Sequence, residues 1–330
     1  MKIVQFREYG GAEVLELVDV PEPVPGPGEI LVRTEAIGVG VPDILMRRGD
    51  YNWIPPLPVI PGNELAGTVE AVGSEGEKVK PGDRVYVNSR ELPQRGGAYA
   101  EMMVVPTTAV FAMPDTVSAE QAVALGNYQL AWLLLNFASS PMAGDAILVH
   151  AAAGGAGSAL IQMAKRQGLT VYGVAGSPDK ARYVTGLGAD AAIDRSADDI
   201  GERIAALTGS SGVNFIYDAV GGKGFANNFG MLSPMGKIVM FGQIAGMPDP
   251  NILNPMREHI GHCVALRLFS IHVLDDKPEI RHGAMAEAMA ALAAGEIASR
   301  IHARLPLAEA SEAHRLLESG GVTGKIVLIP

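Results

Sequence analysis

The sequence is poor in cysteine, in aromatic residues and in charge, and each shortage excludes a class of protein. Cys263 is the only cysteine of the 330 residues, so no internal disulfide and no cysteine-rich zinc site can form. Aromatic residues make up 5% and charged residues 19%, whereas hydrophobic residues reach 48%, which favours a buried core over disorder. The 36 acidic and 26 basic residues give a net charge of −10, which argues against a nucleic acid or an anionic membrane as partner.

Long apolar runs and an N-terminal leader are also missing. No stretch of about 18 apolar residues is free of charges and helix breakers, so the sequence predicts no transmembrane span. Residues 1–6 lack the basic start and the apolar core of a secretory signal peptide. We therefore expect a cytoplasmic protein without a membrane partner.

The character of the sequence changes near residue 118, which predicts two domains. Before it, short runs rich in Val and Ile, such as Glu29–Thr34, Leu65–Val72 and Arg84–Val87, alternate with Pro-Gly and Gly-Asp turns. Such spacing is typical of a small β-barrel or sandwich. After it, a long helical pattern (Ala119–Ala138) leads into strands that alternate with helices, and this alternation predicts a parallel, doubly wound sheet.

The expected strands of that sheet are short and apolar, and the chain ends in two helices and a strand. The strands are Ala146–His150, Thr170–Ala175, Ala191–Ile193, Val213–Asp218, Lys237–Phe241 and Val264–Phe269. The intervening helices are Ala156–Gln167, Pro178–Leu187 and Asp198–Thr208, and the last elements are Glu279–Ala294, Leu307–Glu318 and Lys325–Ile329.

A glycine-rich turn follows the first of these strands and opens a helix. It reads His150-Ala-Ala-Ala-Gly154-Gly155-Ala156-Gly157. In this context backbone N–H groups can approach a pyrophosphate at a helix N-terminus, so the turn predicts dinucleotide binding. The alternative is an ordinary tight turn of an α/β domain, and we expect His150 to serve packing.

The end of the second strand indicates which dinucleotide binds. NAD enzymes usually place an acidic residue there to hold the ribose 2′-hydroxyl, but this chain has Gly176 and Ser177, with Lys180 nearby and Arg195 after the third strand. A hydroxyl and two cations suit a 2′-phosphate, so we predict NADPH as the cofactor. The alternative is that both cations are solvated surface charges.

These features occur together with several further motifs. They are Pro27-Gly-Glu-Ile-Leu-Val32, Pro61-Gly-Asn-Glu-Leu-Ala-Gly67, Gly82-Asp-Arg-Val85, Gly96-Gly-Ala-Tyr-Ala-Glu101, Tyr217-Asp-Ala-Val-Gly221 and Thr323-Gly-Lys-Ile-Val-Leu328. Over nearly its whole length the chain resembles the zinc-independent medium-chain dehydrogenase/reductase superfamily, in its quinone oxidoreductase (zeta-crystallin-like) family.

The resemblance implies an α/β fold with two domains. Residues 1–120 and 271–330 would form a GroES-like, β-barrel-type N-terminal domain that the C-terminal segment completes. Residues 121–270 would form a Rossmann domain, with the cofactor in the cleft between the two. It also implies a homodimer that pairs the last Rossmann strand, Val264–Phe269, whose apolar edge is otherwise exposed.

The resemblance also assigns site residues. The expected cofactor-binding residues are Gly154, Gly155 and Ala156 at the pyrophosphate, Ser177, Lys180 and Arg195 at the 2′-phosphate, Phe241, Gly242 and Gln243 beside the nicotinamide ribose, and Gln129, Arg267 and Lys325 close to the cofactor. The expected substrate pocket contains Gly40, Asp43, Leu45 and Asn63, with Asp43 paired to Arg47 four residues later on a helix.

No metal is expected. Zinc-binding members of the superfamily carry Cys at the position of Gly40 and His at that of Asn63, and this chain has neither ligand. His259 and His262 have helical spacing but lack a third ligand, and we expect Cys263 to be buried at a strand edge. Without a Lewis acid, alcohol oxidation is disfavoured, which leaves acceptors that take a hydride readily.

The resulting hypothesis is hydride transfer from NADPH to a quinone. The proton would come from water or from Tyr51, which is the candidate proton donor within the protein. Quinone oxidoreductases often have Asn at Gly40 and Tyr at Leu45. The first alternative is therefore a reductase of enones, enals or enoyl thioesters, the last needing cations such as Arg90 and Arg95. The second alternative is a non-catalytic NADPH-binding protein.

Overall fold

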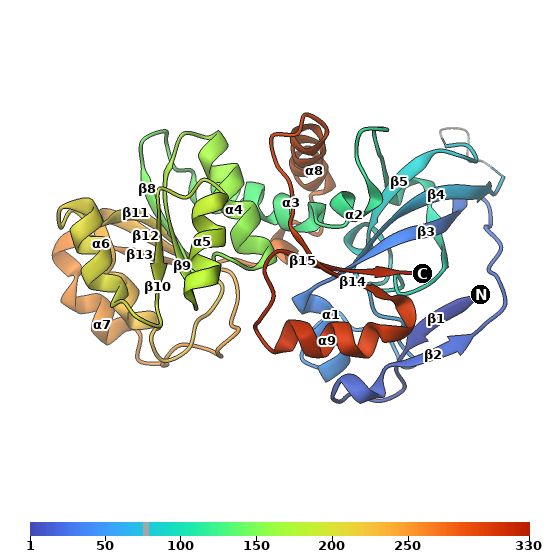
Figure 1. Ribbon diagram of the computed structural model, residues 1–330, viewed down its shortest axis with the longest axis horizontal. Helices are drawn as coiled ribbons and strands as arrows, with labels where there is room; N and C mark the ends of the chain where they lie inside the picture. Colours follow the sequence, from blue (N-terminus) through green and yellow to red (C-terminus); the bar gives the residue numbers. More distant parts are fainter. Residues whose placement is uncertain (75–78) are drawn as a thin grey trace. The chain divides into compact units, whose positions relative to one another are not determined.

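The computed structural model describes residues 1–74 and 79–330, and its contacts divide them into two compact units (Figure 1). The first unit comprises Met1–Gly126 and Met289–Pro330, and the second Asn127–Ala288. Residues 271–288, which the sequence analysis assigned to the first domain, group with the second unit. Here the Gln129 side chain donates to the carbonyl of Arg281 (2.9 Å), and the Arg281 guanidinium donates to that of Asp275 (3.0 Å).

The first unit is built on a mainly antiparallel sheet that the C-terminal segment completes. Its strand order is β14-β15-β3-β4-β5-β7, with β6 paired to β3 and only β14 and β15 parallel. The strands are β3 (Glu29–Val39), β4 (Glu64–Val72), β5 (Arg84–Asn88), β6 (Met102–Pro106), β7 (Val110–Ala112), β14 (Ile301–Pro306) and β15 (Lys325–Ile329). A separate hairpin-like pair joins β1 (Lys2–Gln5) to β2 (Glu16–Asp19), and the α-helices are α1 (Val41–Arg48), α2 (Ala119–Ala122) and α9 (Ala310–Glu318).

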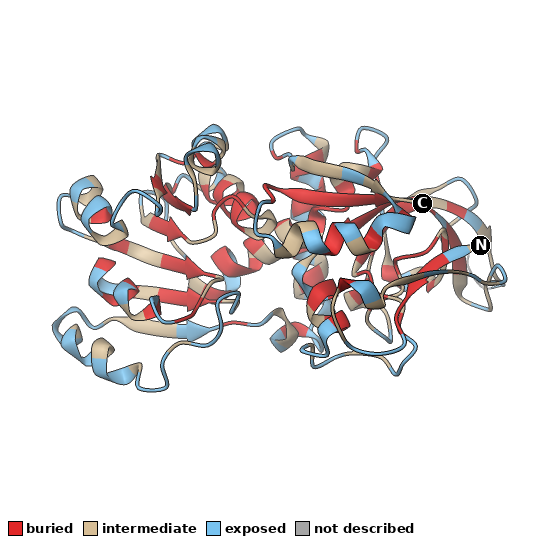
Figure 2. Ribbon diagram, turned by 60° about the horizontal axis from the view of Figure 1, so that its bottom comes forward, coloured by how far each residue is buried: buried red, intermediate tan, exposed pale blue. Residues whose placement is uncertain are grey.

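The core of this unit explains why the C-terminal strand joins the sheet of the N-terminal segment. Ile326 of β15 lies opposite Val39 of β3, and both side chains are buried with Leu65 of β4. The strand that ends at the C-terminus is buried along most of its length (Figure 2). Gly67 permits the close approach of β3 and β4, because a Cβ there would lie 2.0 Å from the carbonyl oxygen of Arg33.

The second unit confirms the predicted doubly wound sheet. Its six parallel strands have the order β10-β9-β8-β11-β12-β13, which is the Rossmann order 3-2-1-4-5-6. The strands are β8 (Ala146–Val149), β9 (Thr170–Ala175), β10 (Ala191–Asp194), β11 (Val213–Asp218), β12 (Leu232–Met240) and β13 (Ala265–Leu268). The helices are α3 (Leu125–Leu133), α4 (Gly155–Arg166), α5 (Pro178–Gly186), α6 (Ile200–Thr208), α7 (Leu253–Glu258) and α8 (Pro278–Ala293), where α3 begins and α8 ends in the first unit.

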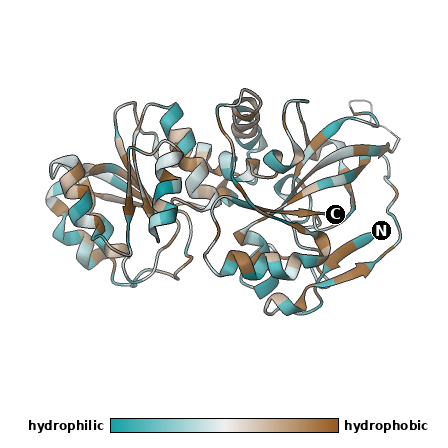
Figure 3. Ribbon diagram, viewed as in Figure 1, coloured by the Kyte–Doolittle hydropathy of each residue, from teal (hydrophilic) through white to brown (hydrophobic). Residues whose placement is uncertain are grey.

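Burial in this unit follows the pattern of a sheet covered on both faces. β8 and β9 are almost fully buried, and Figure 3 colours the strands of the sheet mainly as hydrophobic, with hydrophilic residues on the surrounding helices. The order reverses between β8 and β11, so the carboxyl ends of these strands mark the place where open α/β sheets bind ligands.

Two expectations about local structure were wrong. The single helix expected over Ala119–Ala138 is divided into α2, α3 and a π-helical turn, Leu134–Ser139. Cys263 is exposed, because it ends a short 3-10 turn with a left-handed backbone (φ 50°) just before the edge strand β13. None of the helices among the described residues is long and apolar enough to cross a membrane.

Candidate cofactor and acceptor sites

The glycine turn has the geometry of an anion site. It follows β8, and Gly154 is the N-cap of α4, whose first residues, Gly155 and Ala156, have N–H groups without an acceptor inside the helix. A Cβ on Gly157 would lie 2.4 Å from the carbonyl oxygen of Ala151, so glycine is required for the helix to pack on the turn. Unpaired N–H groups at a helix N-terminus attract a phosphate, and the turn therefore fits a pyrophosphate.

The three residues expected at the 2′-phosphate lie together. The Ser177 hydroxyl caps α5 by accepting from the Lys180 amide (3.4 Å). A Cβ on Gly176 would lie 3.5 Å from Arg195 Nε and Nη2, so the guanidinium lies over this glycine. Burial, and then the charge of Arg195, lower the pKa of Lys180. Two neighbouring cations that repel each other favour an anionic ligand.

The residues expected near the nicotinamide are only partly brought together. The amide of Phe241 donates to the carbonyl of Asp218 (2.9 Å), and Gly242 lies so close to Ala219 that a Cβ would come 2.7 Å from its carbonyl oxygen. These contacts join the loops after β11 and β12, and Gln243 is exposed beside them.

Two further candidates for the cofactor are engaged with the main chain of their own unit. Arg267 donates to the carbonyl of Ala138 (2.9 Å), at the end of the π-helical turn. Gln129, whose side chain is buried, donates to the carbonyl of Arg281. Each bond uses one donor of the side chain and fixes its direction.

Sequence reasoning missed a polar network at the switch point. The buried carboxylate of Asp218 accepts from the amides of Val220 (2.6 Å) and Gly221 (3.0 Å) and from the Asn228 side chain (2.8 Å). Asn228 Oδ1 lies 2.8 Å from Nε2 of His150, the residue before the glycine turn. The network therefore holds the loops that follow β8 and β11.

The expected substrate-pocket residues form a buried polar cluster in the first unit. Asp43 is fully buried, and its carboxylate accepts from the Gly40 amide (2.8 Å) and from the Asn63 side chain (2.6 Å). Burial raises the pKa of Asp43 to about 6, although these two donors and the charge of Lys325 oppose the shift. The Ser89 hydroxyl donates to Asn63 Oδ1 (2.9 Å), so the amide is held at both ends.

The expected pair between Asp43 and Arg47 was wrong. Arg47 is buried and turns to α9, where it donates to Glu318 (2.6 Å), and it also donates to the carbonyl of Gly10 (3.1 Å). Helical spacing made the Asp43 contact available, but the carboxylate of Glu318 and the loop carbonyl supply Arg47 with partners in the folded chain.

Lys325 lies in this cluster, in the first unit. Its ammonium forms an ion pair with Oε1 of Glu64, and both side chains are buried. Oε2 of Glu64 accepts from the Tyr86 hydroxyl (2.8 Å) and from the Gly126 amide (3.2 Å). No local pattern predicted the pair with Glu64, since the two residues lie 261 positions apart in the chain.

The remaining candidates line the surface near α1 or are engaged locally. Leu45 is partly buried on α1, and Tyr51 packs with Ile54 on a small core, with its ring 5.4 Å from that of Trp53. Arg95 donates to carbonyls of Ser89 and Arg90. Among the residues that the structure describes, no group of three or more His, Cys, Asp and Glu residues is arranged to hold a metal ion.

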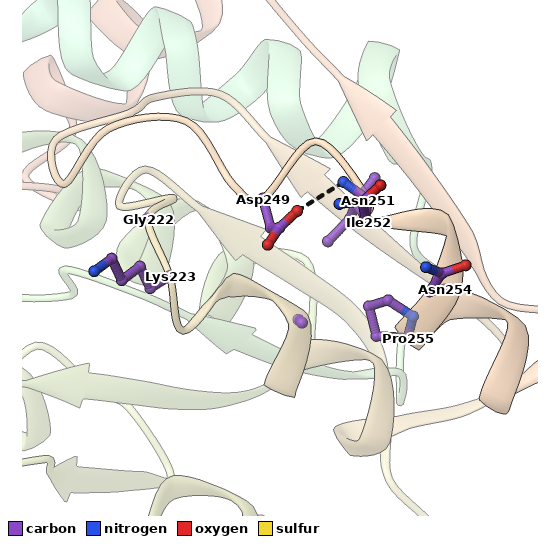
Figure 4. A pocket seen from close by; sticks show the side chains of 8 residues that line it. Gly222, Lys223, Asp249, Asn251, Ile252, Asn254 and Pro255 are labelled. Carbon is purple, nitrogen blue, oxygen red and sulfur yellow. Dashed lines mark hydrogen bonds between the residues drawn. The ribbon is translucent and has the colours of Figure 1, made fainter.

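A separate cavity of about 230 Å³ lies in the second unit (Figure 4). It lies between the loop after β11, with Gly222 and Lys223, and the segment that leads into α7, with Asp249 and Asn251. The Asn251 amide donates to the Asp249 carboxylate (2.8 Å), which closes the turn. None of the residues predicted as site residues lines this cavity.

Comparison with known proteins gives two family models and many relatives. Residues 26–115 match the alcohol dehydrogenase GroES-like domain, and residues 155–274 match the zinc-binding dehydrogenase domain. The chain is 36% identical to a quinone oxidoreductase of Pseudomonas aeruginosa, over 100% of this chain and 99% of the relative. Its structure resembles that of a Pseudomonas syringae quinone oxidoreductase, with a TM-score of 0.90 and 34% identity over 100% of this chain and 99% of that chain. It also resembles the Escherichia coli quinone oxidoreductase solved with NADPH, with a TM-score of 0.90 and 30% identity over 100% of both chains.

Proposed function

Since this chain belongs to the quinone oxidoreductase family of the medium-chain dehydrogenase/reductase superfamily, we propose that it is an NADPH-dependent oxidoreductase that transfers a hydride to a quinone. The observation that carries the proposal is the pair of cations, Lys180 and Arg195, beside a strand end that has Gly176 in place of an acidic residue. The Escherichia coli relative solved with NADPH supports the same cofactor.

Each part of the glycine turn and its surroundings has a task in NADPH binding. Gly154 would face the pyrophosphate, the amides of Gly155 and Ala156 would donate to it, and Ser177, Lys180 and Arg195 would hold the 2′-phosphate. The loop of Phe241, Gly242 and Gln243 would accompany the nicotinamide ribose. When bound, NADPH supplies the hydride, and the chain supplies proximity and orientation.

We propose that the reaction is independent of zinc. Gly40 has no side chain to ligate a metal, and the Asn63 amide is engaged with Asp43 and Ser89. Soft thiolate or imidazole ligands are therefore missing from the two positions at which zinc-binding members carry them. A proton would arrive from water or from Tyr51, which lies partly exposed after α1.

A conjugated alkene is the second candidate acceptor. Leu45 and Gly40 leave this part of the pocket without the hydrogen-bonding side chains that quinone oxidoreductases often have there. Fewer hydrogen-bonding side chains at these two positions suit an enone or enal as well as a quinone.

We also propose a homodimer, formed through β13 in a soluble, cytoplasmic protein. β13 is an edge strand, and its Leu268 is 66% exposed. Met235 of the neighbouring strand β12 is 76% exposed. Pairing of two β13 strands would cover this apolar edge.

Turnover with a panel of acceptors tests the proposal. NADPH and NADH oxidation would be measured with a benzoquinone, a naphthoquinone, an aromatic enone and a 2-alkenal. Oxidation of NADPH by quinones, with NADH much slower, is the expected result. Turnover of the alkenes alone would assign the enzyme to C=C reduction, and no turnover with any acceptor would leave an NADPH-binding protein.

A further inference from the structure

The ammonium of Lys325 is unusual because it is buried but sparsely bonded. Only 4% of its side chain is exposed, and among the described residues Nζ has Glu64 as its single hydrogen-bond partner. An ammonium has three N–H donors, and buried donors are normally satisfied. Two N–H groups therefore remain for a ligand, since both oxygens of Glu64 are already used.

The backbone is shaped to bring this ammonium to one place. A Cβ on Gly38 of β3 would lie 2.7 Å from Lys325 Cε and 2.8 Å from Glu64 Cγ, so the glycine makes room for the pair. At the next glycine, Gly40, a Cβ would lie 3.9 Å from Lys325 Nζ. Gly40 and Asn63 are partly exposed, in contrast to the buried charges beneath them.

The charges of the cluster suit an oxygen ligand. Asp43 lies on the other side of Gly40, where a Cβ would come 3.7 Å from its Oδ2, and the charge of Lys325 acts on this carboxyl. Its carboxylate oxygens are engaged by the Gly40 amide and by Asn63. The ammonium therefore has unused N–H donors beside Gly40, and a carbonyl oxygen is a group that they would bind.

We propose that Lys325 Nζ is a catalytic electrophile that binds the carbonyl oxygen of the acceptor, at the position beside Gly40 where zinc-binding members carry a metal ligand. The inference rests on the proposed function and replaces the expected role of Lys325 in cofactor binding. NADPH, when bound, would supply the hydride; the π electrons of the acceptor's carbonyl would then move onto oxygen, and this oxyanion would take one proton from solvent. The ammonium stabilises the charge that develops on oxygen.

Kinetics of a charge-balanced pair of variants test the role. Lys325→Met leaves Glu64 as an unpaired buried charge and is expected to be unstable, whereas Glu64→Gln with Lys325→Met removes both charges. For the double variant we expect an unchanged NADPH dissociation constant and a kcat about 100-fold below that of the wild type, the usual effect of losing one oxyanion donor. Wild-type activity in the double variant would overturn the proposal, because Lys325 would then serve only to neutralise Glu64.

A steric variant tests the position. Gly40 has an ordinary extended backbone (φ −140°), and a Cβ there meets no atom closer than 3.4 Å. Gly40→Ala should therefore fold and bind NADPH normally, but raise KM because its methyl group occupies the space beside Nζ. An unchanged KM would show that the acceptor does not approach this point.

An optical titration separates this inference from the proposed function. 4-Nitrophenol resembles the product oxyanion, and its yellow phenolate is detected without NADPH or turnover. The wild-type protein is expected to bind it as the phenolate at a pH at which the free phenol is mostly protonated, and the double variant should not. No yellow complex with the wild type, or the same complex with the double variant, would overturn the role of Lys325. If the enzyme forms the yellow complex but none of the acceptors supports NADPH oxidation, the proposed function is refuted and the inference about Lys325 is not.

Discussion

Replacing Lys180 with alanine should weaken the binding of NADPH and leave the binding of NADH unchanged. Burial of the ammonium, and then repulsion by the Arg195 guanidinium, lower the pKa of Lys180. A 2′-phosphate would relieve this repulsion and accept a hydrogen bond from Nζ. A hydrogen bond to a charged group is worth about 1.5–3 kcal/mol, and partial exposure of Lys180 favours the lower end.

The expected change is therefore about tenfold in the dissociation constant of NADPH. Titration of nucleotide fluorescence would measure both constants, with Arg203→Ala as the control, because Arg203 forms an exposed pair with Asp198 elsewhere in the same unit. Gly176→Asp makes the reverse test, since its carboxylate would lie beside Arg195 and compete with the phosphate. Equal loss of NADPH and NADH binding in Lys180→Ala would refute the assignment of this site to a 2′-phosphate.

Three other substitutions test the structure around the sites. Arg47→Met should lower the free energy of unfolding in urea by about 1–3 kcal/mol, because the Gly10 carbonyl loses its donor and Glu318 keeps only Arg48 as an ion-pair partner, and an unchanged free energy of unfolding would contradict the buried role. Gly157→Ala should abolish NADPH binding, since the added Cβ meets the Ala151 carbonyl, whereas wild-type affinity would exclude the close turn. The buried His314 has its pKa lowered to about 3 by burial and by Arg47, so the unfolded chain binds more protons between about pH 6.5 and 3 and stability falls as the pH is lowered through this range. His314→Gln should flatten this part of the pH profile of the unfolding midpoint, and an unaltered profile would show that His314 takes up its proton in the folded state.

Local sequence patterns were sufficient for the parallel sheet but not for all of the fold. β8 and β9 are nearly continuous apolar runs, so their positions followed from the local sequence alone. β14 was missed although Ile301–Pro306 alternates apolar residues with His302 and Arg304, because a segment this short and ending in proline is a weak local signal; it forms a strand by pairing with β15. That pairing depends on distant residues, which no local pattern contains.

The candidate sites divide in the same way. The glycine turn and the cations near Ser177 lie at strand ends and could be predicted from their spacing. The ion pairs of Lys325 and Arg47 could not be predicted, because the acidic partner of each lies more than 250 positions away in the chain. Buried ion pairs are decided by which groups the fold brings together, and the sequence leaves several partners open.

The rate of NADPH oxidation in a single turnover, with hydrogen or deuterium at C4 of the nicotinamide, tests the central claim most directly. Enzyme loaded with NADPH would be mixed with a benzoquinone in one series and an aromatic enone in another. The account predicts rapid oxidation that deuterium slows on one face of the ring only, and in the enone series the deuterium should appear at the reduced carbon. NADPH that remains bound and unoxidised with every acceptor would contradict the assignment of hydride transfer to this chain.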